Sequence, residues 1–350
     1  MSEVEKNVGR KVLNFGPGSP DFPPSERYKE KLKEFFDDPK AHLYPGFPPI
    51  PEFSEGIIAW YKNRFGTDIS QSELYPLIGA KDGIAHISLA LLDQGDEILL
   101  PDPGYPAYEG MALMAGARPV FYRDISELKQ YISSKTKAMW VNFPANPTGS
   151  VITKEELAAI VEIAKKNGIW LLYDNAYSEI TFDGFRAPSV LEIPGAKDVA
   201  LELGSFSKMF SFAGYRMGWV AGNGNLINAL AKIKSQVDSG LSLPFQRLAG
   251  FALTHPDKDW SGAMLASYQG RRDTILSHLQ KIGLTASIPK GGLYLWARIP
   301  EGYTDSEAYS LDILEKKQIL FTPGTAFGAS GKDYVRVSFC VNVDTISEYF

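Results

Sequence analysis

The chain has 350 residues, a formal net charge of −5 and 44% hydrophobic residues, which is the composition of an ordinary soluble globular protein. Its charges are mixed along the sequence, and no run of Lys and Arg indicates a nucleic-acid or membrane surface. A single cysteine, Cys340, excludes an intramolecular disulfide and a cysteine-based metal cluster.

Three further observations narrow the class of protein. No stretch has the apolar core of a signal peptide or the length of a membrane-spanning helix, so we expect a cytoplasmic protein. The four histidines are scattered without metal-ligand spacing, so we expect no metal site. The length favours two domains over one.

The N-terminal part is rich in proline and glycine. The strings FGPGSPDFPPSE and LYPGFPPIPEF indicate loops or extended arms rather than helices. Short apolar runs then predict strands, namely LYPLIG, EILLPD, RPVFYR, AMWVNF, IWLLYD, ALELGSF and RMGWVAG. Helical patterns such as DGIAHISLALL and KEELAAIVEIAKK lie between several of them. This alternation predicts an α/β fold with a mainly parallel central sheet flanked by helices.

The second of these helices has a clear start signal, because Thr153 precedes Glu156 with capping-box spacing. After about Gly240 the pattern changes to a long helical stretch from Pro244 to about Lys281. The string GGLYLWARIP, a helix over residues 306–317 and the strand YVRVSF follow, an order that predicts a smaller α+β domain.

We therefore divide the chain into three segments. Residues 1–40 are expected to form an N-terminal arm and part of the small domain, and residues 41–241 a large domain that carries the ligand site. Residues 242–350 are expected to form the small C-terminal domain. A long helix beginning near Asn225 is expected to join the two domains.

The first motif with chemical meaning is LIGAKDGIAHI. A strand, the turn Gly79-Ala80-Lys81 and then a helix leave free backbone N–H groups at a helix N-terminus, a geometry that binds phosphate. The motif lacks the Walker and dinucleotide fingerprints, so ATP and NAD fit poorly. A short glycine turn before an ordinary helix is the alternative interpretation.

Two motifs follow the next strands along the chain. Tyr105, in PDPGYPAY, lies in a loop where its ring could stack on a flat heterocycle, although ordinary core packing explains it as well. Asn146, in NFPANPTG, lies in a turn directly after a strand, with an amide free to donate to an oxygen. A plain β-turn is the simpler interpretation of that string in isolation.

In IWLLYDNAYSEI, Asp174 comes directly after a run of apolar residues, at the carboxyl end of a predicted strand. Open α/β sheets bind their ligands at that edge. A carboxylate there could pair with a protonated pyridine nitrogen and keep the ring an electron sink. Tyr177 follows within one turn and could reach a phenolic oxygen of the same ring. The alternative is an Asp that caps a helix.

The most informative string is SFSKMFSFAGYRMGW. Lys208 lies between small hydroxyl residues at the end of a buried strand, where desolvation lowers the pKa of an amine. A neutral amine can form a Schiff base with an aldehyde. Ser205, Ser207 and Arg216 supply hydroxyls and a positive fork that suit a phosphate dianion. An exposed Lys and an Arg in a surface pair would be the alternative.

The last motif is YVRVSF, in which Arg336 interrupts an alternating apolar strand. Arg is almost never fully buried without a partner, and a bidentate bond to a substrate carboxylate would provide one. A position on the solvent face of the strand would explain the residue equally well.

Together these segments supply a phosphate cradle, an aromatic platform, an amide, a carboxylate, an amine and a carboxylate clamp, and one common site explains them better than six unrelated features. The motifs resemble those of the class I/II aminotransferases, which are pyridoxal 5′-phosphate (PLP) enzymes of fold type I. The resemblance runs from about Asn14 to Ser338. It implies PLP as the cofactor, the fold type I architecture and a homodimer with shared active sites.

The resemblance also implies roles for single residues. Lys208 would be the Schiff-base lysine and Asp174 the partner of the pyridine nitrogen. Asn146 and Tyr177 would bond the ring's phenolic oxygen, and Tyr105 would stack on the ring. The cofactor phosphate would be held by Ala80, Lys81, Ser205 and Arg216, with Ser207 assisting.

Three more roles concern the substrate and the neighbouring subunit. Tyr44, in HLYPGF, is similar to the tyrosine that reaches the phosphate of the partner subunit. Gly18, in FGPGSPD, is similar to the loop glycine over the substrate, and Arg336 to the clamp for the α-carboxylate.

A finer resemblance, to LL-diaminopimelate aminotransferases, rests on GAKDGIAH, ELGSFSKMFSFAGYRMGW and VDSGLSLPFQ. The expected reaction moves an amino group from an L-amino acid, with LL-diaminopimelate as one candidate, to a 2-oxo acid such as 2-oxoglutarate by a ping-pong mechanism. Asp238 stands where aspartate-specific members carry an Arg, and it could face a distal ammonium group of the substrate. A C–S β-lyase on the same fold is the main alternative, and a non-enzymatic PLP-binding regulator is a weaker one.

Overall fold

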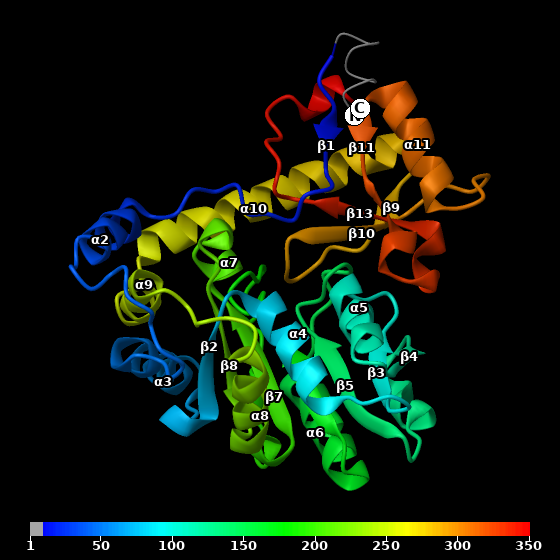
Figure 1. Ribbon diagram of the computed structural model, residues 1–350. Coiled ribbons are helices and arrows are strands. Elements are labelled where there is room, and N and C mark those ends of the chain that lie inside the picture. Colours follow the sequence, from blue (N-terminus) through cyan, green and yellow to red (C-terminus); the bar gives the residue numbers. More distant parts are fainter. Residues whose placement is uncertain (1–9) are drawn as a thin grey trace.

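The structure, a computed structural model, describes residues 10–350 (Figure 1). Its largest element is a seven-stranded sheet in the order β2-β8-β7-β6-β5-β3-β4. The strands are β2 (Leu74–Leu77), β3 (Glu97–Pro101), β4 (Arg118–Tyr122), β5 (Thr136–Asn142), β6 (Trp170–Asp174), β7 (Ala200–Ser205) and β8 (Gly218–Gly222). β8 runs opposite to the other strands of this sheet, which are parallel to one another, and this confirms the predicted strands and the mainly parallel arrangement.

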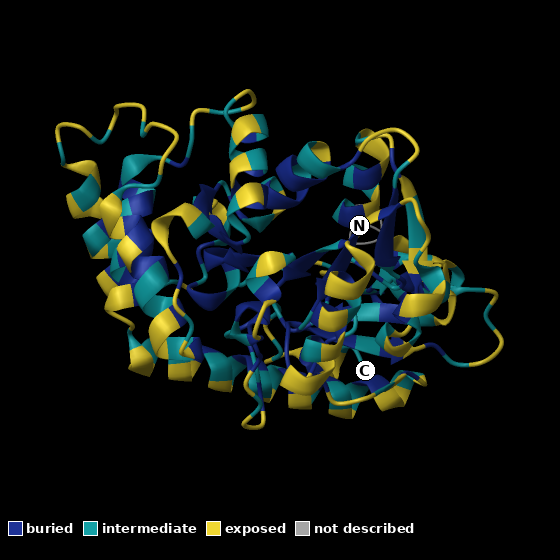
Figure 2. Cartoon of the chain, turned by 90° about the horizontal axis from the view of Figure 1, so that it is seen from below, coloured by how far each residue is buried: buried dark blue, intermediate teal, exposed yellow. Residues whose placement is uncertain are grey.

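Helices cover both faces of this sheet. The helices on one face are α4 (Ala80–Leu91), α5 (Pro106–Met114) and α8 (Gly224–Lys234). Those on the other are α3 (Pro51–Phe65), α6 (Lys154–Asn167) and α9 (Leu243–Thr254). Every residue of β2, β7 and β8 is buried, because neither sheet face reaches solvent. Figure 2 shows this pattern, with buried strands inside and exposed outer faces on the helices.

The side chains of β5 show how one strand supplies both cores. Trp140 and Ala138 pack with α4 and α5, whereas Met139 and Val141 pack with α6 on the opposite face. Because successive side chains of a strand point to opposite faces, a continuous apolar run is needed when both faces are buried. The predicted capping box of α6 is confirmed, since Thr153 and Glu156 bond each other's backbone N–H groups.

A second, smaller body carries a four-stranded sheet in the order β12-β13-β10-β9. Its strands are β9 (Thr285–Ala286), β10 (Tyr294–Arg298), β12 (Thr322–Pro323) and β13 (Tyr334–Ser338). A separate parallel pair, β1 (Leu13–Asn14) with β11 (Ile319–Leu320), brings the N-terminal segment beside it. Two helices, α10 (Lys258–Leu279) and α11 (Ser306–Lys317), pack on these strands in a core of their own.

The predicted helical stretch from Pro244 to about Lys281 is helical over most of its length, but the structure divides it into two helices, α9 and α10. Pro256 lies between them and cannot continue a helix, since it lacks an N–H group and its ring clashes with the preceding turn. Asp257 then starts α10 by accepting a hydrogen bond from the backbone N–H of Trp260.

The expected joining helix near Asn225 is wrong. The helix in that position, α8, ends at Lys234 and covers the large sheet. In Figure 1 it is α10 that runs from α2 (Glu26–Phe36) and α9 to the smaller body. Trp260, near its start, packs against the hydrophobic cores of both bodies. In the described part of the chain, no helix has the length and apolar character to cross a membrane.

Candidate active site

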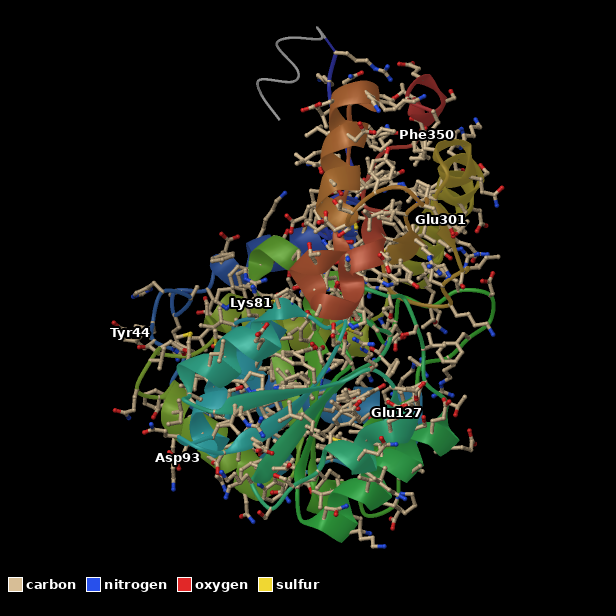
Figure 3. All side chains as sticks on the ribbon, turned by 90° about the vertical axis from the view of Figure 1, so that its right-hand side faces the viewer. Tyr44, Lys81, Asp93, Glu127, Glu301 and Phe350 are labelled. Atoms are coloured by element: carbon tan, nitrogen blue, oxygen red, sulfur yellow. The ribbon has the colours of Figure 1, made fainter. Side chains whose placement is uncertain are left out.

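A cavity of about 440 Å³ lies at the carboxyl ends of β5, β6 and β7, beside the smaller body. Its lining contains all the predicted site residues except Tyr44, namely Gly18, Ala80, Lys81, Tyr105, Asn146, Asp174, Tyr177, Ser205, Ser207, Lys208, Arg216 and Arg336. Tyr44 is 84% exposed and lies at the edge of the molecule, away from Lys81 (Figure 3). The structure therefore assembles one site from segments that span the chain.

Lys208 lies in the short helix α7 (Phe206–Met209), directly after β7. Its Nζ donates a hydrogen bond of 2.6 Å to the backbone oxygen of Gly18. The pKa of Lys208 is lowered to about 8, chiefly by burial, and the nearby positive charges of Arg336 and Arg216 act in the same direction. The neutral, nucleophilic fraction of this amine near physiological pH is therefore much larger than that of an ordinary lysine.

Asp174, the last residue of β6, is the buried carboxylate of the cavity. It accepts hydrogen bonds from the hydroxyl of Tyr108 at 2.7 Å and the backbone N–H of Ala176 at 3.1 Å. Burial raises its pKa above the usual range, against the effect of these two bonds. A cation bound opposite this carboxylate would offset that desolvation and restore its charge.

Arg336 reaches the cavity from β13 in the smaller body. Its Nη1 donates to the side-chain oxygen of Asn146 at 3.0 Å, and its Nη2 donates to the backbone oxygen of Gly16 at 2.8 Å. The rings of Tyr294 and Phe327 lie 4.2 and 4.6 Å from the guanidinium carbon. Its Nε is buried without a hydrogen-bond partner among the described residues, so the site offers a positive donor to an anion.

The phosphate cradle lies at the start of α4. Gly79 caps the helix with φ 83°, and a Cβ at this position would lie 2.4 Å from a nitrogen of Arg216. Glycine is therefore required both for the backbone conformation and for the approach of Arg216. The first N–H groups of any helix have no partner within it, so those of Ala80 and Lys81 are available at the cavity.

Sequence analysis missed Tyr294, which lines the cavity from β10. Its hydroxyl lies 3.1 Å from that of Tyr177 and so joins the two bodies across the site. Gly18 packs against it so closely that a Cβ there would lie 1.8 Å from the Tyr294 hydroxyl. Burial raises the pKa of Tyr177 well above its usual range, which keeps that phenol protonated.

Asn142 and Tyr108 were missed as well. Asn142 donates to the backbone oxygen of Asp174 at 2.8 Å and accepts from the backbone N–H of Asn146 at 2.9 Å. Its position at the end of β5 could have identified it, because the sheet edge there was already the expected site. Tyr108 faces Asp174 from α5, a contact that no spacing in the sequence indicates.

The suggestion that Asp238 faces the substrate is not supported in this chain. Its Oδ2 lies 2.6 Å from Nζ of Lys234, and its Oδ1 accepts from the backbone N–H of Gly240 at 2.8 Å. Asp238 is also absent from the residues that line the cavity. Both of its carboxylate oxygens are engaged in a separate buried cluster.

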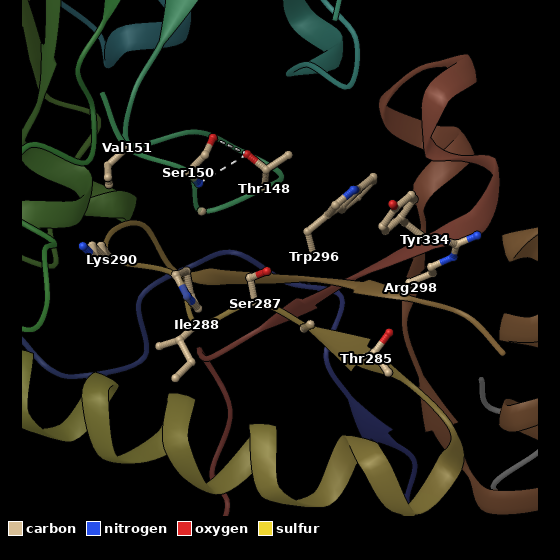
Figure 4. Close-up of a pocket in the computed structure, with 13 residues that line it drawn as sticks. Thr148, Ser150, Val151, Thr285, Ser287, Ile288, Lys290, Trp296, Arg298 and Tyr334 are labelled. Carbon is tan, nitrogen blue, oxygen red and sulfur yellow. Dashed lines mark hydrogen bonds between the residues drawn. The ribbon is translucent and has the colours of Figure 1, made fainter. Parts of the chain in front are cut away.

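A second and larger cavity, of about 810 Å³, lies between residues 148–151 and the smaller body (Figure 4). Trp296 and Tyr334 stack there with ring centroids 5.3 Å apart, and its charged residues, Lys290 and Arg298, are exposed. It has no counterpart of the buried amine and carboxylate. The smaller cavity is therefore the candidate active site.

Residues 10–349 match the family described as aminotransferase class I and II. The chain belongs to this family. It is 37% identical to an LL-diaminopimelate aminotransferase of Halothermothrix orenii, over 99% of this chain and 93% of the relative. It is 39% identical to one of Dehalococcoides mccartyi, over 95% and 88%. A substrate-bound BacF structure from Bacillus subtilis superposes with a TM-score of 0.91 at 32% identity, over 99% and 91%.

This family is PLP-dependent, so the chain is a PLP-dependent aminotransferase of fold type I. The expected cofactor, fold and amino-group transfer are thereby confirmed, and the C–S lyase alternative is not favoured by these relatives. The residues of the cavity fit the cofactor. The cavity offers a buried amine for the aldehyde of PLP and a carboxylate for its pyridine nitrogen. It also offers an aromatic ring for the face of the cofactor ring and a helix N-terminus for the phosphate.

Proposed function

We propose that this aminotransferase takes LL-diaminopimelate as its preferred amino donor and passes the amino group to 2-oxoglutarate in a ping-pong reaction. The observation that carries this proposal is the similarity, over nearly the whole chain, to curated relatives named LL-diaminopimelate aminotransferase. The geometry of the cavity supports the general chemistry, and the following roles for its residues belong to the same proposal.

Lys208 holds the cofactor through Nζ and later moves the substrate proton. When bound, PLP supplies the electron sink that stabilises negative charge at the substrate Cα. With PLP bound, the amine of Lys208 would take the Cα proton of the substrate and would also supply the proton needed on the cofactor side. Its lowered pKa of about 8 suits both directions of this transfer, because acid–base groups work best near the pH of the reaction.

Asp174 keeps the ring nitrogen protonated with its negative charge, while Tyr108 and the backbone of Ala176 fix the direction of the carboxylate. Asn146 and Tyr177 donate to the phenolic oxygen of the ring, and Tyr105 stacks on its face. Orientation of these groups by the fold avoids reorganisation during the reaction.

Arg336 binds the α-carboxylate of the substrate, because its guanidinium lies between Asn146 and the segment that contains Gly18. Gly18 lies in the loop over the substrate, and its lack of a side chain lets the Tyr294 hydroxyl approach this loop closely. The phosphate is held by Ala80, Lys81, Ser205 and Arg216, with Ser207 assisting.

Tyr44 completes the phosphate site of a partner subunit in a homodimer. Support comes from its 84% exposure on a segment that also exposes Leu43 and Phe47, as expected of residues that a second copy covers.

The test is a panel of amino donors with 2-oxoglutarate, with initial rates of glutamate formation as the measurement. We expect a higher kcat/KM for LL-diaminopimelate than for alanine, aspartate or aromatic donors. Equal rates across the panel would disprove the substrate while leaving amino-group transfer intact. Release of pyruvate and ammonia from cystathionine, without glutamate formation from any donor, would favour the C–S lyase instead.

A further inference from the structure

A buried ionic cluster lies outside the cavity, behind the start of α4. Lys234, the last residue of α8, has a side chain that is only 1% exposed. Its Nζ lies 2.7 Å from Oδ2 of Asp82 and 2.6 Å from Oδ2 of Asp238. A buried ammonium is costly unless it is paired, and the two partly buried carboxylates beside it would repel each other without a cation. Lys234 therefore pairs with both carboxylates, and its single positive charge offsets one of their two negative charges.

Asp82 connects this cluster to the phosphate cradle. It is the third residue of α4 and follows Ala80 and Lys81 directly. Its Oδ2 accepts a hydrogen bond of 2.9 Å from the backbone N–H of Ile78, which fixes the turn before the helix. The carboxylate thus lies in the same helical turn whose N–H groups face the cavity.

The charge of Asp82 has a consequence for an anion bound in that turn. A helix N-terminus attracts negative charge, but a carboxylate already there repels a phosphate dianion and weakens that attraction. Buried charges are poorly screened by salt, so a nearby cation has to cancel the carboxylate charge. Lys234 supplies this cation at direct contact distance.

Asp238, at the other end of the cluster, lies near the segment that carries Tyr44. Asp238 fixes the turn before Gly240 through the backbone N–H of that glycine. Gly240 has φ 94°, and a Cβ on it would lie 2.8 Å from the backbone oxygen of Gly46. The turn therefore packs closely against the loop that carries Tyr44, so both ends of the cluster reach segments assigned to phosphate binding.

A metal ion is not needed to explain this arrangement. Ligand atoms of Asp82, His86 and Asp238 lie within 4.8 Å of one another, which is close enough for a bound cation. Nζ of Lys234 contacts both carboxylates and is itself the cation of the cluster.

We propose that Lys234 is a positioning residue that gives the cofactor site its affinity for phosphate, by cancelling the charge of Asp82 in the first turn of α4. This inference rests on the proposed role of Ala80 and Lys81 as the phosphate cradle. Lys234 touches neither cofactor nor substrate. It acts through Asp82 on the N–H groups that receive the phosphate.

The test compares two ligands that differ in the phosphate, PLP and pyridoxal, by equilibrium binding to the cofactor-free protein. In Lys234→Met we expect the affinity for PLP to fall about tenfold or more, and that for pyridoxal less than about twofold. The matched control is Lys232→Met, on the exposed side of the same helix turn, which should change neither affinity. Equal weakening of both ligands would show a merely structural role and overturn the proposal, as would no weakening.

A second variant keeps the test decisive if Lys234→Met does not fold. Asp82→Asn removes the charge that Lys234 cancels, and its side-chain oxygen can still accept from Ile78. We expect the preference for PLP over pyridoxal to stay equal to that of the unchanged protein or to rise. A fall in this preference would overturn the proposal. Failure of the proposed substrate would appear separately, in the donor panel and not in these binding ratios.

Discussion

The two cavities beside the smaller body differ in the ionisable groups that line them, and their volumes do not predict this difference. The larger one, about 810 Å³, is bounded by an aromatic pair, hydroxyl groups and exposed charges (Figure 4). The smaller one, about 440 Å³, holds a buried amine with a lowered pKa and a buried carboxylate with a raised pKa. Catalytic groups typically have pKa values that their surroundings shift from the usual range. The smaller cavity contains such groups.

Topology explains the difference between the cavities. The candidate active site lies at the carboxyl ends of parallel strands, so the residues after β5, β6 and β7 converge there. The larger cavity is bounded by β9, β10 and the turn at residues 148–151, where side chains have solvent on one side. Each cavity contains a Lys, an Arg and a Tyr, which allows matched substitutions.

The lysine pair should give the largest contrast. Lys208→Ala removes the group that we propose holds the cofactor and moves the proton, so we expect kcat to fall at least about a thousandfold. The visible absorption band of the bound cofactor should disappear with it. In Lys290→Ala, in the larger cavity, kcat should change less than about twofold. Retention of full transamination by the first variant would refute the active-site assignment.

The arginine pair should give the next largest contrast. Arg336→Gln removes the half-buried cation that we propose binds the α-carboxylate of the donor, and we expect kcat/KM to fall about a hundredfold. Steady-state kinetics with LL-diaminopimelate and 2-oxoglutarate measure this change. Arg298→Gln, on the neighbouring strand β10, is the control and should leave kcat/KM within about twofold. A comparable loss in both variants would mean that the larger cavity also takes part in the reaction.

The sequence predicted the residues that follow strands, because apolar runs and turn residues mark the carboxyl edge of a parallel sheet. Asp174, Asn146 and Lys208 were found in this way. Tyr294 was missed because GGLYLW reads as an ordinary buried strand. Only the antiparallel pairing of β10 with β13 brings its ring against Arg336.

Other features of the structure could not be predicted in full from the sequence, because they depend on tertiary contacts. Lys234 and Asp238 have the i,i+4 spacing of a helical ion pair, which the sequence shows. Their link to Asp82 joins residues 152 positions apart, and no local pattern indicates it. The break between α9 and α10 is different, since Pro256 marked it and the surrounding helical periodicity concealed it.

The protonation of the Lys208 amine should depend on pH differently from that of an exposed amine such as Lys290. Its pKa is lowered to about 8 from an unfolded value near 10.5, so between these values the native state binds fewer protons than the unfolded state. The contribution of this group to stability therefore rises with pH across that window and is smallest below pH 8. Burial is the largest cause of the shift.

Acetylation of the cofactor-free protein, followed by peptide mass spectrometry, would measure this titration. We expect the rate of labelling at Lys208 to rise with a midpoint near pH 8, with Lys290 in the same digest as the reference for reagent reactivity. Arg336→Gln should move the midpoint upward, because it removes a positive charge that favours the neutral amine. A midpoint near 10.5 in the unchanged protein would show that the cavity does not desolvate this amine.

The tyrosine pair should give the smallest contrast. Tyr294→Phe keeps the ring against Arg336 but removes the hydroxyl that lies 3.1 Å from Tyr177. A neutral hydrogen bond contributes about 1 kcal/mol, so we expect kcat/KM to fall about fivefold, with the thermal midpoint nearly unchanged. Tyr334→Phe, whose ring stacks on Trp296 in the larger cavity, is the control and should show no kinetic change. If Tyr294→Phe kept full activity, the hydroxyl would have no role, and the position of Tyr294 in the cavity would reflect packing of its ring against Arg336 alone.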